Sequence, residues 1–319
     1  MKITLEMINE QLREGKMSLN FEEKFLSKES FCTAMDYATK SCVKQKPDDM
    51  QYSEEWITRK DGSKLRIVIY KPLEFKDNVP GVMWIHGGAF ATGIPELIEP
   101  YARMMIKESN CVVVSPDYRL SLEAPYPAAF DDCFDALLWM KENIRELGIR
   151  EDQIMLGGDS AGASLAVAVS LKARDTGEVN IAFQMPLFPA LDDRMESESM
   201  KDNNSPVVDS STIKYMWQVY LGELFEKEVP AYAAPARADD FRGLPPTLSY
   251  VGGVDPLRDD MVQYSDNLRK AGVPVYFEVF DGGYHGFETF CPDADISKRA
   301  ISFFLNIFKY AVENYFAKQ

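Results

Sequence analysis

The most informative part of the sequence is IMLGGDSAG, residues 154–162. Its first three residues are apolar and predict a strand, and the small residues of 161–173 predict a helix directly after it. The turn between them holds a G-x-S-x-G motif with Ser160 at its centre. This strand–turn–helix context is what a serine nucleophile requires, because the hydroxyl must project from a sharp, strained turn. Gly158 and Gly162 leave room for such a turn, so we predict a nucleophile; the alternative is an ordinary glycine-rich turn.

Strand-like and helix-like segments alternate on both sides of this stretch. Strands are predicted at 81–85, 111–114, 154–156, 181–188, 247–251 and 275–280, and helices at 127–147, 161–173, 258–271 and 301–316. Two extended runs within 54–70 flank Asp61-Gly62, a turn dipeptide that predicts a hairpin. Repeated alternation implies a mostly parallel sheet with helices on both faces. Although about 150 residues is typical of one domain, α/β folds of 319 residues are common, so we predict a single domain over 1–319.

Composition and charge exclude several classes of protein. Hydrophobic residues make up 46% of the chain and charged residues 27%, as in an ordinary globular protein. The net charge of −15 opposes binding to nucleic acid and to anionic membranes. The amino-terminal segment lacks the apolar core of a secretion signal, and no apolar run approaches the ~18 residues of a membrane span. These features predict a soluble, cytoplasmic chain without a nucleic-acid or membrane partner.

The cysteines do not form a recognisable framework. They are Cys32, Cys42, Cys111, Cys133 and Cys291. Their number is odd, no C-x-x-C pair occurs, and the spacing is not that of a zinc site. We expect reduced thiols packed as small apolar residues. P-loop, H-E-x-x-H and G-x-G-x-x-G motifs are also missing, so the sequence predicts no metal and no cofactor.

A serine hydroxyl is a weak nucleophile until a base takes its proton, and the chain has only two histidines. His285 follows the predicted strand 275–280 in the glycine-rich stretch DGGYHGF, where a side chain can project into a site. Asp255 follows the predicted strand 247–251, in GGVDPL. The order serine, aspartate, histidine is that of α/β-hydrolases. We therefore predict His285 as the base and Asp255 as the acid that orients it.

Two neighbouring carboxylates are alternatives for the acid. Asp259 and Asp260 rank below Asp255, because they lie at the start of a predicted helix, where acidic residues favour the helix dipole in any case.

The segment HGGAF, residues 86–90, follows the predicted strand 81–85. Gly87 and Gly88 have no side chains, so their N–H groups can approach a ligand closely and stabilise the oxyanion of acyl transfer. The N–H of Ala161, next to the nucleophile, is the third predicted donor. His86 is interpreted as an orienting residue of this loop, because His285 fits the triad order better.

The chain resembles the hormone-sensitive lipase-like family of α/β-hydrolases, which includes many bacterial esterases. The matching segments are HGGAF at 86–90, DYRL at 117–120, PAA at 127–129, GDSAG at 158–162, DPLRD at 255–259 and HGF at 285–287. The resemblance implies a mostly parallel eight-stranded sheet and a helical cap made from about 1–50 and about 189–243. It also implies the triad and oxyanion donors named above. The chain departs from the family at Ala163, where glycine is frequent, and at 121–124, where Ala-Pro-Glu-His is frequent.

The sequence therefore predicts a serine carboxylic-ester hydrolase that acts on a small-molecule ester. Charges at 192–202 in the expected cap disfavour contact with lipid, and the aromatic group Tyr215, Trp217, Tyr220 and Phe225 is suited to closing a small pocket. We expect short acyl chains, roughly two to six carbons, as substrates. An amidase or a transacylase with the same triad, and a non-catalytic ligand-binding member of the fold, are the alternatives. Members of this family often pair through the last strand, here 275–280, so a homodimer is possible.

Overall fold

A computed structural model describes residues 1–13 and 19–317 of the chain. Residues 14–18 belong to the first of the two expected cap segments and, like 318–319, lie outside the described residues.

One mixed sheet organises the described residues. Its strands are β1 (Gln51–Thr58), β2 (Lys64–Lys71), β3 (Val79–Ile85), β4 (Val112–Pro116), β5 (Ile149–Asp159), β6 (Phe183–Leu187), β7 (Thr247–Gly252) and β8 (Val275–Phe280). They lie in the order β1-β2-β4-β3-β5-β6-β7-β8. β2 is antiparallel to β1 and β4, and every other neighbouring pair is parallel. The predicted eight-stranded, mostly parallel sheet and its amino-terminal hairpin are confirmed.

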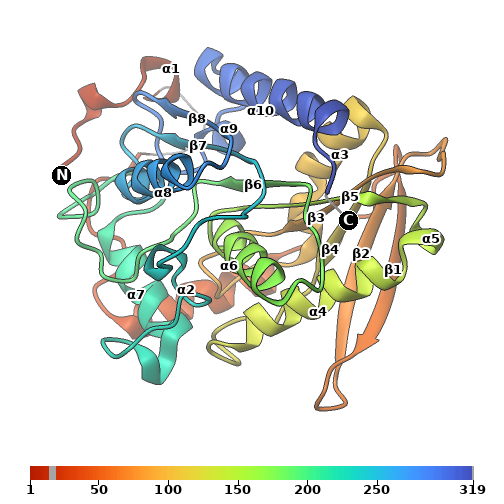
Figure 1. The fold of residues 1–319 in the computed structure, drawn as a ribbon. Helices are drawn as coiled ribbons and strands as arrows, with labels where there is room; N and C mark the ends of the chain where they lie inside the picture. Colours follow the sequence, from red (N-terminus) through yellow and green to blue (C-terminus); the bar gives the residue numbers. More distant parts are fainter. Residues whose placement is uncertain (14–18, 318–319) are drawn as a thin grey trace.

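Helices cover both faces of this sheet (Figure 1). They are α1 (Glu10–Arg13), α2 (Lys28–Ser41), α3 (Glu99–Ser109), α4 (Ala128–Glu142), α5 (Ile144–Leu147), α6 (Ala161–Thr176), α7 (Ser210–Leu221), α8 (Arg258–Lys270), α9 (Phe287–Phe290) and α10 (Asp295–Asn314). Short 3-10 turns lie at Leu5–Met7, Pro95–Ile98, Gly222–Leu224 and Pro235–Arg237. α3 and α10 pack on one face, and α4, α6 and α8 on the other. Each face is apolar, since strands of a parallel sheet are buried on both sides.

Several elements differ in length from the prediction. β5 begins at Ile149, five residues before the predicted start at 154. Arg150–Asp152 interrupt the apolar pattern there, and the pairing with β3 shifts register opposite Val79. The predicted helix 127–147 is divided at Asn143 into α4 and α5. α10 begins at Asp295 and extends its buried face toward its amino end. α3 was not predicted; it fills the crossover from β3 to β4 that a parallel pair requires.

Two segments far apart in the sequence meet at one end of the sheet. α2 packs against α7 there (Figure 1). The N–H of Lys24 donates to Asp209 Oδ2 at 2.9 Å, and the N–H of Phe25 donates to Ser211 Oγ at 3.1 Å. Asp209 also caps the start of α7 by accepting the N–H of Thr212 at 2.8 Å. One carboxylate therefore fixes both the start of α7 and the chain leading to α2.

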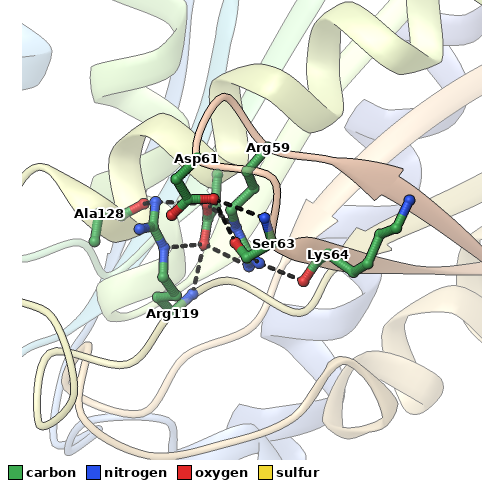
Figure 2. Close-up of polar contacts among 7 residues, drawn as sticks. Arg59, Asp61, Ser63, Lys64, Arg119 and Ala128 are labelled. Atoms are coloured by element: carbon green, nitrogen blue, oxygen red, sulfur yellow. Dashed lines mark hydrogen bonds and ion pairs between the residues drawn. The ribbon is translucent and has the colours of Figure 1, made fainter.

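The loop after β4 is braced by a fully buried carboxylate, Asp132 of α4. Arg119 in this loop donates to Asp132 from its N–H at 2.8 Å, from Nε at 3.0 Å and from Nη2 at 2.9 Å. Arg59, from the turn after β1, donates from Nε at 2.7 Å and from Nη2 at 3.0 Å. Figure 2 shows Arg59 and Arg119 converging from the hairpin and the loop, with Ser63 and Lys64 contacting Arg59. These charge-assisted bonds hold the hairpin, the loop and α4 together, even though the chain departs from the family pattern at 121–124.

No helix in the described part of the chain is both long and apolar enough to cross a membrane.

Candidate active site

Ser160 lies in the turn between β5 and α6 with φ 52° and ψ −122°. Backbone with positive φ is disfavoured for residues other than glycine, so the surrounding structure must hold this turn in place. Close packing of the turn on β3 does so. A Cβ atom on Gly162 would lie 2.1 Å from the carbonyl oxygen of Ile85, and one on Gly158 would lie 2.6 Å from the same oxygen. Neither position has space for a side chain, so both must be glycine, as the motif predicted.

The structure brings His285 and Asp255 together with Ser160. Nε2 of His285 lies 2.8 Å from Oγ of Ser160, and Nδ1 lies 2.8 Å from Oδ2 of Asp255. The other Asp255 oxygen accepts the N–H of Leu257 at 2.9 Å, which fixes the carboxylate. Phe188 packs edge-to-face on the imidazole at 5.0 Å. The three residues follow β5, β7 and β8, whose carboxyl ends share one edge of the sheet.

The electrostatic environment favours the charged form of His285. Burial lowers its pKa, but the charge of Asp255 and the hydrogen bond that the imidazole donates to Asp255 more than offset burial, so the pKa is raised above 6.5. An imidazole held in this way can take a proton from Ser160 and retain it while the reaction proceeds.

The two alternative acids lie elsewhere. Asp259 accepts the N–H of Ser199 at 2.8 Å and Nε of Arg258 at 2.7 Å. Asp260 is buried, and burial raises its pKa to about 7. Among the described contacts of His285, Asp255 is the carboxylate that accepts a hydrogen bond.

The predicted oxyanion loop follows β3 and lies beside the nucleophile turn. The N–H of Gly87 donates to Oδ2 of Asp159 at 3.2 Å, and a Cβ on Gly87 would lie 2.4 Å from that oxygen. Trp84 Nε1 donates to the other Asp159 oxygen at 3.2 Å. Removal of Asp159 from water raises its pKa to about 6. Gly87 was predicted as an oxyanion donor, but its N–H is already engaged by this carboxylate.

The next amides along the loop are available. Within the described residues, the N–H groups of Gly88, Ala89 and Ala161 donate to no protein acceptor. Gly88 and Ala89 are half-buried, so a ligand can reach them. Sequence reasoning omitted Ala89, since its availability depends on its backbone conformation, with φ 54°, which no pattern in the sequence reports.

His86 is fully buried below this loop and takes no part in the Ser160 contacts. Its ring stacks on Tyr118 with centroids 4.3 Å apart, and Tyr118 Oη donates to the His86 carbonyl at 3.0 Å. Nδ1 lies 2.7 Å from the carbonyl oxygen of Gly87. Burial lowers the pKa of His86 to about 4, which keeps the ring neutral.

Clusters of metal-ligating side chains do not occur in residues 1–13 and 19–317: no group of three or more His, Cys, Asp or Glu is placed to hold a metal ion.

Comparison with known proteins identifies the family of the chain. Residues 82–289 match a family described by the alpha/beta hydrolase fold. Esterase LipI of Mycobacterium tuberculosis is 36% identical over 222 residues, which cover 69% of this chain and 69% of LipI. An arylesterase of Saccharolobus solfataricus is 34% identical over 231 residues, covering 70% of this chain and 72% of the arylesterase. The solved structure of a bacterial heroin esterase is similar with a TM-score of 0.84 and 31% identity, covering 97% of this chain and 99% of that chain.

The family match and these relatives define a carboxylesterase-type hydrolase. The chain belongs to the α/β-hydrolase fold family, and its resemblance to the hormone-sensitive lipase-like group is confirmed.

The two histidines should titrate far apart. We expect His86 to titrate near pH 4 and His285 above pH 6.5, as measured by NMR of the two imidazoles, with His285→Gln assigning the signals. Asp255→Asn should lower the pKa of His285, because the carboxylate charge is lost, and should leave that of His86 unchanged. A wild-type His285 with a pKa below 6.5, or a His285 pKa that Asp255→Asn leaves unchanged, would contradict the electrostatic argument.

Proposed function

We propose that the protein hydrolyses short-chain carboxylic esters through a covalent acyl-enzyme formed on Ser160. The observation that carries this proposal is the pair of 2.8 Å contacts that His285 makes, one with Ser160 and one with Asp255. A histidine oriented on one nitrogen by a buried carboxylate is free to act as a base through the other nitrogen.

The proposed reaction has two halves. His285 takes the proton of Ser160 as Oγ attacks the ester carbonyl, and the resulting tetrahedral oxyanion collapses to release the alcohol, which His285 protonates. A water then loses a proton to His285 and attacks the acyl-enzyme, and the acid departs as Oγ recovers its proton. Asp255 stays ionised and stabilises the imidazolium in both halves.

For the oxyanion we propose the N–H groups of Gly88, Ala89 and Ala161. Gly87 is replaced in this role because its N–H donates to Asp159. Donors that are fixed before the substrate arrives require no reorganisation when negative charge develops, which is the main advantage of such a site.

We propose that about 1–50 and about 189–243 form the cap, within a single domain over 1–319. Some of its charges are paired with one another, such as Asp192 with Arg194 at 2.7 Å and Asp193 with Arg237 at 2.5 Å. Placing such pairs against lipid would be costly. The rings of Trp217 and Tyr220, which the sequence suited to closing a small pocket, are buried against Phe90 of the loop that holds Gly88, so they close the cap onto this loop.

Relatives named as an arylesterase and a heroin esterase support small ester substrates. We also propose that two chains pair through β8, because β8 ends the sheet and no strand in the described part of the chain pairs with its outer edge. The net charge of −15 disfavours nucleic acid as a partner. An amidase or a transacylase with the same triad would differ only in leaving group or acceptor, so rates on matched esters, amides and alcohol acceptors separate these alternatives.

The triad assignment has a matched pair of tests. Asp255→Asn should lower kcat by about 10³–10⁴-fold, because the histidine loses its orienting charge and correct tautomer. Asp259→Asn should leave kcat/KM near the wild-type value, since Asp259 contacts Arg258 rather than His285. Ser160→Ala should remove nearly all turnover of an aryl acetate while circular dichroism stays unchanged. If Asp259→Asn were more damaging than Asp255→Asn, the acid would be wrongly assigned.

Acyl-chain length tests the pocket. Across esters from acetyl to palmitoyl, kcat/KM should rise by up to about fourfold for each methylene that is buried and should fall where the pocket ends. We expect the maximum at roughly two to six carbons. A maximum at about twelve carbons or more, or a rate jump when the substrate forms droplets, would show that the cap acts as a lipase lid.

A further inference from the structure

The oxyanion loop contains two adjacent residues in a conformation that L-amino acids avoid. Ala89 has φ 54° and Phe90 has φ 57°, directly after Gly88 with φ 119°. Neither Ala89 nor Phe90 has the short polar side chain that makes this backbone easier to adopt. Such a segment persists only when its surroundings hold it there, and strained segments of this kind concentrate at functional sites.

Hydrogen bonds within the loop and from the loop after β4 hold only part of this segment in place. The N–H groups of Ala91 and Thr92 donate to the carbonyl of Gly88 at 2.9 Å and 3.0 Å, which closes the turn. The N–H of Ser121 donates to the carbonyl of Phe90 at 2.8 Å. These hydrogen bonds fix the backbone carbonyls of Gly88 and Phe90. They do not involve the Phe90 side chain.

The two expected cap segments supply further contacts. The fully buried ring of Phe90 stacks on Tyr220 of α7, with centroids 3.8 Å apart and an interplanar angle of 12°, and lies 6.0 Å from Trp217. From α2, Thr39 Oγ1 donates to Thr92 Oγ1 at 2.9 Å. One helix therefore contacts the middle of the strained segment and the other contacts its end.

We propose that Phe90 is a positioning residue through which helix α7 holds the amides of Gly88 and Ala89 in place for the oxyanion. This inference rests on the proposed function. The direction of the Ala89 N–H is set by the backbone torsions of Gly88 and Ala89. Because the strained torsions of Ala89 and Phe90 are adjacent, a loop that relaxes at Phe90 also turns this amide away from the oxyanion. The cap then serves the chemical step itself, in addition to enclosing the substrate.

Tyr220→Leu tests the proposal, because it removes the stacked ring from the cap without changing the loop. We expect kcat to fall about tenfold or more while KM stays close to wild type, since oxyanion contacts act in the transition state. The inhibition constant of a trifluoromethyl ketone, which forms a tetrahedral oxyanion on serine, should rise by the same factor as kcat falls. Tyr220→Phe keeps the ring and should behave as wild type.

Two further variants separate positioning from general damage. Tyr232→Leu removes another ring of the 189–243 segment, one that stacks on Phe130 at 5.4 Å and 12°, and should leave kcat unchanged. Thr39→Val removes the hydrogen bond to Thr92 together with the bond that the same hydroxyl makes to the Met35 carbonyl within α2, a change that the fold should tolerate, and should lower kcat several-fold at constant KM.

Three results would overturn the proposal: equal losses of kcat in Tyr220→Leu and Tyr232→Leu, a Tyr220→Leu enzyme altered only in KM, or an unchanged inhibition constant. Retention of wild-type activity by Ser160→Ala is a separate result; it would overturn the proposed function and the positioning role with it.

Discussion

The site depends on one close approach, that of the first turn of α6 to the end of β3. At Gly162 the approach leaves no space for a Cβ, because the carbonyl oxygen of Ile85 would lie 2.1 Å away. Beside this contact the chain passes through a positive φ at Ser160, and the Ser160 hydroxyl lies within hydrogen-bond distance of His285. The same approach places β3, and therefore the loop after it, beside the nucleophile. A larger residue at this position would separate the serine from its oxyanion donors.

Parallel strands explain why much of the site could be predicted from the sequence. Residues that follow parallel strands gather at one edge of the sheet, so a serine, an aspartate and a histidine placed after three predicted strands were expected to meet. The structure brings Ser160, Asp255 and His285 within hydrogen-bond distance along that edge. Asp259 and Asp260 fit the same chain order and ranked below Asp255 because they lie at the start of a predicted helix, and that start is the first turn of α8.

Features that depend on local torsions or on distant contacts could not be predicted in this way. Ala89 replaces Gly87 as a proposed oxyanion donor because Asp159 accepts the N–H of Gly87. Which amide faces Asp159 depends on the backbone torsions of the loop, which include positive φ values. The stack of Phe90 on Tyr220 joins segments that no local pattern connects. β5 was predicted too short because Arg150–Asp152, at its register shift, break the apolar run that marks a buried strand.

Covalent labelling of the nucleophile tests the central claim most directly. A fluorophosphonate loses fluoride as serine Oγ bonds to phosphorus, so its rate reports how far His285 activates the hydroxyl, independently of any assumed substrate. The account predicts a single adduct on Ser160 by peptide mass spectrometry, and a labelling rate that rises with pH through a midpoint above 6.5, the direction set by Asp255. An adduct on another residue, or a rate that stays constant down to about pH 4, would contradict it.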